Sequence, residues 1–219
     1  MLPPTIQAVS LLRNEINDCC IFRVPEGSCE LPSMVPGEFY SWQFYLRSVL
    51  LNAAHLKTIC QDFWARYGDA YKQNPFQISG VESAASPIIA ALILYFSDLG
   101  YKLNAFTIRK ERKSYGRGNL IEGRPNNLPV LLVDDLTSAS HKTFWHAVDA
   151  LNLHSLKIYN HAYVLVRKEP RCVNPIINTV HGGIQVQSMF TLNDFSLEYE
   201  THLQEILLMA RMENIFSRL

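Results

Sequence analysis

Two adjacent carboxylates, Asp134 and Asp135, directly follow a run of four apolar residues at positions 130–133. Small hydroxylated side chains come next, at Thr137 and Ser138. The apolar residues beyond them recur at the spacing of an amphipathic helix. We therefore expect the pair at the carboxyl end of a buried strand, just before a helix N-terminus. Ligands of open α/β sheets bind at that edge, and the free amides of a helix N-terminus suit an anion.

This combination of groups favours a phosphorylated sugar. Two neighbouring carboxylates suit a cation or a sugar that becomes positively charged, and the short loop at 137–141 suits a phosphate. Together they indicate a phosphorylated ribose handled with a divalent metal. A single strand–turn–helix phosphate loop is a weak signal, so a purely local role for Asp134 and Asp135, in capping the loop, stays open.

A basic segment lies upstream, at residues 108–123. It holds five Arg or Lys residues and three glycines. Long loops of this kind are often lids, and a lid that closes over a charged substrate excludes water and supplies cations. The alternative is a solvated basic loop with no part in chemistry.

In this order, the two segments resemble the type I phosphoribosyltransferases, and most closely the orotate phosphoribosyltransferases. Residues 109–116 are similar to the flexible catalytic loop of that family, and 133–135 to its signature for 5-phosphoribosyl 1-diphosphate (PRPP). Residues 80–87 resemble its pyrophosphate-binding loop, and 164–169 the strand end that places an arginine against the base. Residues 186–195 resemble its late strand. The resemblance covers roughly residues 40 to 200.

The resemblance implies roles for particular side chains. The expected catalytic residues are Lys113, Tyr115, Asp134 and Asp135. The residues expected against the phosphate groups of PRPP are Arg109, Lys110, Glu82, Ser83, Ala84, Thr137, Ser138, Ala139, Ser140 and His141. Arg167 is the residue expected against the base. Mg²⁺, which prefers oxygen ligands and substrate phosphates, would bridge the pyrophosphate and the ribose hydroxyls near the two aspartates.

Three positions depart from the family pattern. The loop at 137–141 has no glycine, whereas the family usually has one or two there, and glycine lets a phosphate approach the backbone closely. Tyr115 stands where the lid commonly carries His. Ala84 stands where some members carry Lys in the pyrophosphate loop.

The resemblance implies an enzyme that transfers phosphoribose between PRPP and a nitrogenous base, orotate first among the candidates. Two alternatives stay open. One is a regulatory protein that binds a nucleotide or PRPP with reduced catalysis, which the missing glycines favour and the retained basic lid opposes. The other is a phosphoribosyltransferase for a different base. Because the family's lid often reaches the neighbouring subunit's site, we expect a homodimer.

Length and composition are compatible with one α/β domain and a small appendage. The chain has 219 residues, of which 48% are hydrophobic, and equal numbers (20 each) of basic and acidic residues. A zero net charge gives no argument for nucleic acid or a membrane surface as partner. The longest apolar run, 88–96, is too short to cross a bilayer. The cysteines at 19, 20, 29, 60 and 172 form no recognised metal or disulfide pattern, so we expect reduced thiols in a cytoplasmic protein.

The elements that must position these residues alternate along the chain. We expect helices at 5–13, 51–67 (ended by Gly68), 86–99, 141–152 and 203–216. We expect strands at 39–46, 76–80, 103–108, 130–133, 156–166 and 186–195. Alternating strands and helices predict an α/β fold with a mostly parallel sheet flanked by helices. Residues 1–38 would form an N-terminal segment that is part of a small hood, and 39–219 the phosphoribosyltransferase-like domain.

Overall fold

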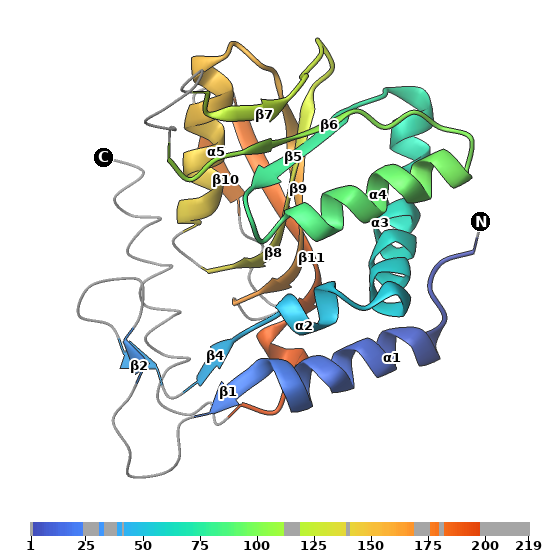
Figure 1. Ribbon diagram of the computed structural model, residues 1–219, viewed down its shortest axis with the longest axis vertical. Helices are drawn as coiled ribbons and strands as arrows, with labels where there is room; N and C mark the ends of the chain where they lie inside the picture. The colour runs from blue at the N-terminus through green and yellow to red at the C-terminus, as the bar shows by residue number, and fades with distance from the viewer. Residues whose placement is uncertain are drawn as a thin grey trace.

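A seven-stranded sheet forms the centre of the molecule (Figure 1). The structure is a computed structural model that describes residues 2–23, 42–111, 119–138, 141–168, 176–179 and 182–197, together with the backbone of 31–32 and 39–40. The strands of the sheet are β5 (Gln77–Val81), β6 (Ala105–Ile108), β7 (Ile121–Gly123), β8 (Val130–Thr137), β9 (Ile158–Arg167), β10 (Ile176–Thr179) and β11 (Gly182–Thr191).

Five of these strands are parallel, in the spatial order β6-β5-β8-β9-β11, and the antiparallel strands β7 and β10 close the two edges. The sequence order reverses between β5 and β8. The chain leaves β5 towards one edge, whereas β8 leads towards the other. This is the topological switch point at which open α/β sheets bind ligands. The expected mostly parallel sheet is confirmed.

Helices cover both faces of the sheet. Helices α3 (Ala53–Gln73) and α4 (Ser86–Asp98) pack on one face, and α5 (Lys142–Leu153) packs on the other (Figure 1). Successive side chains of a strand point to opposite faces of the sheet, so each strand contributes to both cores. Tyr163 belongs to the core beneath α3 and α4, and its neighbour Val164 belongs to the core beneath α5. The sheet is therefore buried on both sides, which is why its central strands are almost continuously apolar.

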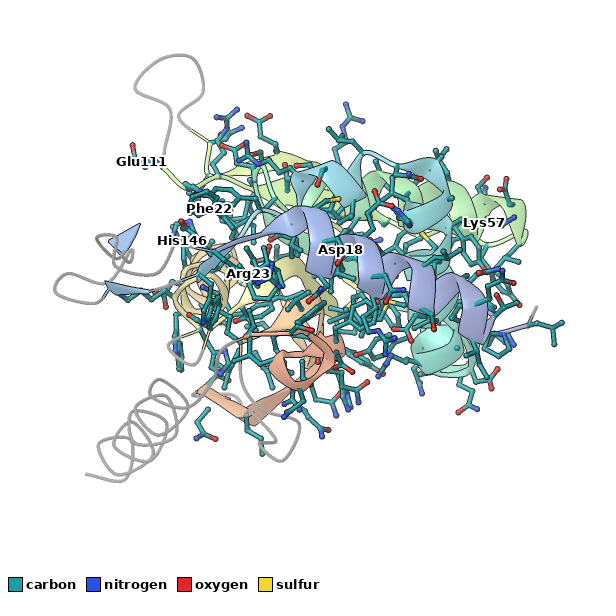
Figure 2. The ribbon with its side chains drawn as sticks, turned by 90° about the horizontal axis from the view of Figure 1, so that it is seen from below. Asp18, Phe22, Arg23, Lys57, Glu111 and His146 are labelled. Carbon is teal, nitrogen blue, oxygen red and sulfur yellow. The ribbon has the colours of Figure 1, made fainter. Side chains whose placement is uncertain are left out.

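We call the elements before α3 the hood, a set that includes residues 42–50, which we expected in the phosphoribosyltransferase-like domain. Its elements are α1 (Ile6–Glu15), the π-helix η1 (Ile16–Cys20), β1 (Ile21–Arg23), β4 (Trp42–Phe44) and α2 (Arg47–Leu50), with a separate pair of β2 (Leu31–Pro32) and β3 (Phe39–Tyr40). The ring of Phe44 lies 5.4 Å from that of Phe195, which follows the short helix η2 (Leu192–Asp194) after β11. Viewed from below, α1 and the segment through Asp18 and Arg23 cross this end of the molecule (Figure 2). The hood thus shares one apolar core with α3, α4 and β11.

Gln77 links neighbouring segments at the amino-terminal end of β5, the end away from the loops that follow β5 and β8. It is fully buried at the start of β5. Its amide nitrogen donates to the carbonyl oxygens of Asn126 at 2.8 Å and Leu128 at 2.6 Å. Its amide oxygen accepts from the side chain of Asn104 at 2.8 Å and from the backbone of Asn126 at 3.0 Å. The side chain satisfies its hydrogen-bonding capacity and ties the entry to β6 and the entry to β8 to the same strand.

Several expected elements differ from the structure. The predicted helix end at Gly68 is wrong, because α3 continues to Gln73. A Cβ at Gly68 would lie 2.7 Å from the ring of Trp64, so the glycine makes room for that ring. The predicted strand 39–46 is broken into β3 and β4, and α2 begins at Arg47.

Other differences concern the sheet and the chain's end. Strand β8 continues through the acidic pair to Thr137, so the two carboxylates lie within the strand and not after it. Strands β7 and β10 were not among the expected elements. The predicted helix 203–216 lies outside the described residues. Cys19, Cys20 and Cys60 are free thiols. Within the described ranges, no helix combines the length and apolar character needed to cross a membrane.

Candidate active site

The loops that follow β5 and β8 meet at the switch point. Strand β5 approaches β8 so closely at Gly80 that a Cβ there would lie 2.2 Å from the carbonyl oxygen of Val133 and 2.5 Å from Cβ of Ala85. No side chain fits in that space. Glycine is therefore required for the approach, and the loop after β5 is held against the acidic end of β8.

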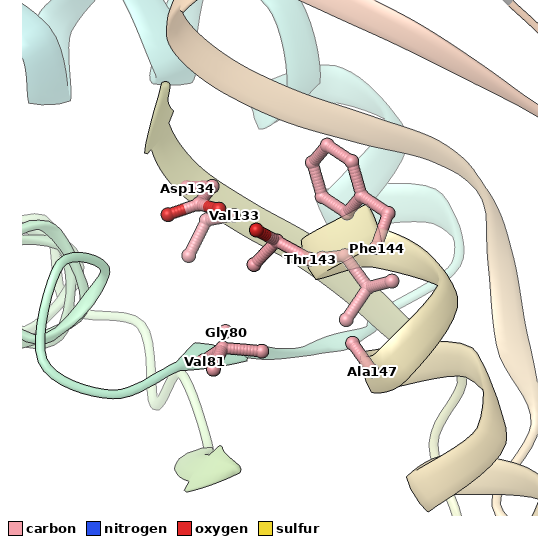
Figure 3. A pocket seen from close by; sticks show the side chains of 8 residues that line it. Gly80, Val81, Val133, Asp134, Thr143, Phe144 and Ala147 are labelled. Carbon is pink, nitrogen blue, oxygen red and sulfur yellow. The ribbon is translucent and has the colours of Figure 1, made fainter. Parts of the chain in front are cut away.

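A narrow gap with no room for a water molecule lies between these strands and the start of α5. Figure 3 shows Gly80 and Val81 of β5 facing Asp134 and the first turn of α5 across this space. The residues that line it are Gly80, Val81, Leu132, Val133, Asp134, Thr143, Phe144 and Ala147. The side chain of Asp134 thus lines a narrow gap beside the helix N-terminus.

Asp134 and Asp135 interact with each other. Asp134 is 3% exposed, and its carboxylate oxygen Oδ1 accepts the backbone N–H of Asp135 at 2.9 Å. Burial and the charge of Asp135 raise the pKa of Asp134 well above its ordinary value, while the charge of Lys110 acts in the opposite direction. Burial also raises the pKa of Asp135, which hydrogen bonds and the charge of Arg47 partly offset. The pair therefore favours a cationic partner.

The loop between β8 and α5 is held by its own residues. The Thr137 hydroxyl lies 3.1 Å from Nδ1 of His141, and the backbone N–H of His141 donates to the carbonyl oxygen of Ser138 at 3.0 Å. His141 precedes the first residue of α5 and adopts a left-handed conformation with φ of 47°. Burial, with the charge of Arg167, lowers the pKa of His141 to about 4. Its imidazole is therefore neutral at pH 7. Ala139 and Ser140 lie outside the described residues.

The loop after β5 is held by distant residues. The backbone N–H of Glu82 donates to the carbonyl oxygen of Ile108 at 2.8 Å, and the Glu82–Ser83 peptide bond is cis. A guanidinium nitrogen of Arg47 donates to the Ser83 hydroxyl at 3.2 Å. Ala84 completes this turn, and Ala85 is buried beside Gly80. This loop thus connects the sheet to the hood.

The base of the basic loop is held on both sides. The guanidinium of Arg109 contacts Glu122 of β7 at 2.7 Å and Glu82 at 3.5 Å. The backbone carbonyl oxygen of Arg109 lies 2.7 Å from Nε2 of His146 on α5. Glu111, just beyond, lies on the same side of the molecule as His146 (Figure 2). Lys113 and Tyr115 lie outside the described residues, so their roles stay predictions.

The third expected component, Arg167, ends β9 beside the loop of β8. It is 8% exposed, and the backbone N–H of the next residue, Lys168, donates to the carbonyl oxygen of Thr137 at 2.8 Å. The Lys168 ammonium lies 5.3 Å from the ring of Trp42 in the hood. The structure therefore brings the hood, Arg167 and the loop after β8 to the same end of the sheet.

No family model matches the chain. Three curated relatives match part of it, and all are named orotate phosphoribosyltransferase. That of Rhodopirellula baltica is 28% identical over 126 residues, which cover 57% of this chain and 62% of the relative. That of Tropheryma whipplei is 34% identical over 127 residues, which cover 58% of this chain and 56% of the relative. The chain thus matches less than two thirds of the length of each.

Solved structures match over more of the chain. A phosphoribosyltransferase from Corynebacterium diphtheriae superposes with a TM-score of 0.63 at 19% identity, over 88% of this chain and all of that chain. The fold is that of the phosphoribosyltransferases. An orotate phosphoribosyltransferase of Mycobacterium tuberculosis, solved in complex with PRPP, has a TM-score of 0.55 at 15% identity, over 87% of this chain and 90% of that chain.

Within this phosphoribosyltransferase fold, three side chains reach the site that sequence patterns did not indicate. Arg47 comes from a four-residue helix whose sequence reads as the end of a strand. Thr143 and His146 lie in the first turns of α5, where the apolar spacing drew attention to their neighbours. Only helical phase could have indicated them, because Thr143 and His146 are three positions apart and therefore share a face of α5.

Proposed function

We propose that this protein transfers the 5-phosphoribosyl group of PRPP to orotate and releases pyrophosphate. The observation that carries the proposal is the convergence of the acidic pair with the base of the basic loop. Gly80 of β5 packs against Val133, next to the pair, and Glu82 of the same loop contacts Arg109 at 3.5 Å. The partial sequence likeness to two orotate phosphoribosyltransferases supports the choice of base. The fold shared with a PRPP-bound enzyme supports the choice of donor.

In the proposed reaction, the bond from C1 of the ribose to pyrophosphate breaks and a bond to a ring nitrogen of orotate forms. The pyrophosphate leaves with the electron pair, so positive charge develops at C1. Asp134 and Asp135 would lie at the ribose 2- and 3-hydroxyls and stabilise that charge. Because both carboxylates are partly or fully withdrawn from water, their effect on a nearby charge is stronger than it would be in solvent.

The 5-phosphate would bind at the loop between β8 and α5. Thr137, Ser138 and the amides at the start of α5 offer donors, and the helix N-terminus favours an anion. His141 is neutral there because burial lowers its pKa to about 4. A neutral imidazole with Nδ1 against Thr137 fixes the hydroxyl and leaves the helix dipole and the amides to hold the phosphate. We propose that this arrangement serves in place of a loop glycine.

Two carboxylates whose ionised forms are disfavoured by burial provide oxygen ligands that suit Mg²⁺. Among the described residues, no cluster of three or more His, Cys, Asp or Glu could hold a metal by itself. We therefore propose that Mg²⁺ arrives with PRPP, with Asp134 and Asp135 nearby. When bound, it would neutralise charge on the leaving pyrophosphate.

We also propose that the basic loop closes over the pyrophosphate. Lys113, Lys110 and Tyr115 would act on the leaving group, while Arg109 would hold the loop's base through Glu82 and Glu122. Arg167 would face the base from the end of β9. A homodimer located in the cytoplasm, in which the loop serves the neighbouring subunit's site, completes the proposal.

The test is release of pyrophosphate from PRPP and Mg²⁺, measured over a panel of free bases. Release that requires orotate supports the proposal. Release with a purine or another base instead would assign a different acceptor and overturn orotate. PRPP binding, measured by calorimetry, without release for any base would replace the enzyme with a regulatory protein that binds PRPP, the function that the glycine-free loop favours.

A further inference from the structure

Arg47 is the first residue of the four-residue helix α2. Leu46, Val49 and Leu50 are buried in the core that the hood shares with α3 and α4. Arg47 itself is exposed. Three buried anchors therefore fix the short helix, and this leaves the arginine side chain directed away from the core.

The guanidinium of Arg47 lies between the two loops of the site. It donates to the Ser83 hydroxyl, in the loop after β5, at 3.2 Å. Its positive charge also lowers the pKa of Asp135, at the end of β8. One cation from the hood therefore reaches both sides of the switch point.

The positive charge of Arg47 is less neutralised than that of Arg109. Arg109 contacts two carboxylates, Glu122 and Glu82. Among the described residues, Arg47 has no carboxylate within the 4.0 Å of an ion pair, and its hydrogen bond to Ser83 uses one of five N–H donors. Residues 82–85 contain one carboxylate and no cation. Because Arg109 is shared between Glu82 and Glu122, Arg47 is the better placed of these two arginines to offer positive charge to an anion at this loop.

We propose that Arg47 binds the pyrophosphate group of PRPP, and the released pyrophosphate, from the hood side of the site. This inference rests on the proposed function and deepens it. A planar guanidinium presents paired donors that match two phosphate oxygens, whereas an ammonium binds as a point charge. Ser83 holds the guanidinium at the loop, so the hood carries a substrate-binding residue in addition to its packing role.

The experiment measures the binding of two probes by calorimetry in the presence of Mg²⁺: pyrophosphate and ribose 5-phosphate. We expect Arg47→Gln to weaken pyrophosphate binding by at least about tenfold, since a charge-assisted hydrogen bond is lost. Ribose 5-phosphate binding should change less than about twofold, because that phosphate belongs at the loop of β8. Arg47→Lys keeps the positive charge but loses the paired donors of the guanidinium (the fork), so its pyrophosphate affinity should lie between those of wild type and Arg47→Gln.

Arg13→Gln is the matched control, since it removes the same charge from an exposed position on α1. It should bind both probes like the wild type. Equal pyrophosphate affinity of wild type and Arg47→Gln would overturn the inference, as would an equal loss for both probes. If Arg47→Gln melts at a lower temperature than the wild type, the Arg47→Lys variant decides the matter: full wild-type pyrophosphate affinity there would show that the fork is not used.

Failure of the proposed function gives a different pattern. A wild-type protein that binds neither probe would overturn the proposed function and this inference together. A wild-type protein that binds pyrophosphate and transfers phosphoribose, with an Arg47→Gln variant whose KM for PRPP is unchanged, would overturn the inference alone. We expect that variant to raise the KM for PRPP and leave the KM for orotate near its wild-type value.

Discussion

The loops after β5 and β8 are neighbours at the same edge of the sheet, yet they are built differently. The loop of β8 is closed by contacts among Thr137, Ser138 and His141, which lie within five positions of one another. The loop of β5 depends on Arg47, which lies 36 positions from Ser83, and on Arg109, which lies 27 positions from Glu82.

The two loops also differ in the source of the positive charge that an anion would meet. The β8 loop carries no net charge, because the imidazole of His141 is neutral. The positive potential on this side comes from the amides at the helix N-terminus. The β5 loop carries a carboxylate and receives its cations from the hood and from the basic loop. We infer that the first side is fixed by local folding and that the second is complete only when separate parts of the chain are assembled.

The largest test of this contrast is Lys113→Ala, in the basic loop. If the pyrophosphate side depends on cations from elsewhere, turnover should fall by about 10²–10³-fold, since loss of a group aimed at developing charge costs about 2.7–4 kcal/mol of barrier. Lys57→Ala on α3 is the control. Wild-type turnover in Lys113→Ala, measured as pyrophosphate release, would remove the basic loop from the mechanism.

The neutral side predicts a pH effect at His141. Burial lowers its pKa from 6.5 to about 4, so the unfolded chain takes up the proton first. The stability that the neutral form contributes is complete above about pH 6.5 and is lost as the pH falls towards 4, by an amount on the order of 2–3 kcal/mol. His141→Gln should flatten this acid loss in chemical unfolding from pH 7 to 4.

The exposed Gln73 at the end of α3 gives a control that carries no titratable group. Gln73→Ala should leave the slope of stability against pH unchanged. An unaltered slope in His141→Gln would mean that the imidazole is already solvated and that the β8 loop is not neutral for the reason given.

The contact between the two loops can be broken at Gly80. A Cβ there would lie 2.2 Å from the carbonyl oxygen of Val133, so Gly80→Ala must push β5 and β8 apart. We expect a loss of about 1–3 kcal/mol in the free energy of unfolding, measured with urea. Ser97→Ala, at an exposed position of α4, is the control. A stability within error of wild type would show that the strands can separate without cost.

The smallest expected effect is a gain. Burial and the charge of Asp135 raise the pKa of Asp134 above its ordinary 3.8, so ionised Asp134 opposes folding and stability is lost as the pH rises through the folded-state pKa. Asp134→Asn should therefore stabilise the free protein, increasingly with pH. A gain of about 1 kcal/mol would raise the melting temperature by roughly 2–4 °C.

The same substitution should lower transferase activity, because the carboxylate is proposed to act on the sugar. Asp149→Asn, on the exposed face of α5, should change neither property. A lower melting temperature for Asp134→Asn at pH 8 would indicate that the carboxylate has a stabilising cation in the free protein.

The sequence predicted the parts of this site that are local. The acidic pair, the hydroxylated loop and the start of α5 follow one another within fourteen residues, from 130 to 143, so periodicity and residue type were sufficient. Arg47 could not be found in that way, because its role comes from the docking of the hood against the sheet. The prediction that Gly68 ends a helix failed for a related reason. The ring of Trp64 occupies the space where a side chain at position 68 would lie, and only the packed structure shows this contact.

Gln77 and Gly80 lie three residues apart on β5 but at opposite ends of the strand. The amide network of Gln77 joins the entries to β6 and β8 at the edge away from the site. Variants at that end would reduce how much protein accumulates in a cell while leaving the affinity of each surviving molecule intact. In a deep mutational scan, variants at the Gln77 end would thus lower abundance alone, whereas variants at the Gly80 end would lower abundance and specific activity together.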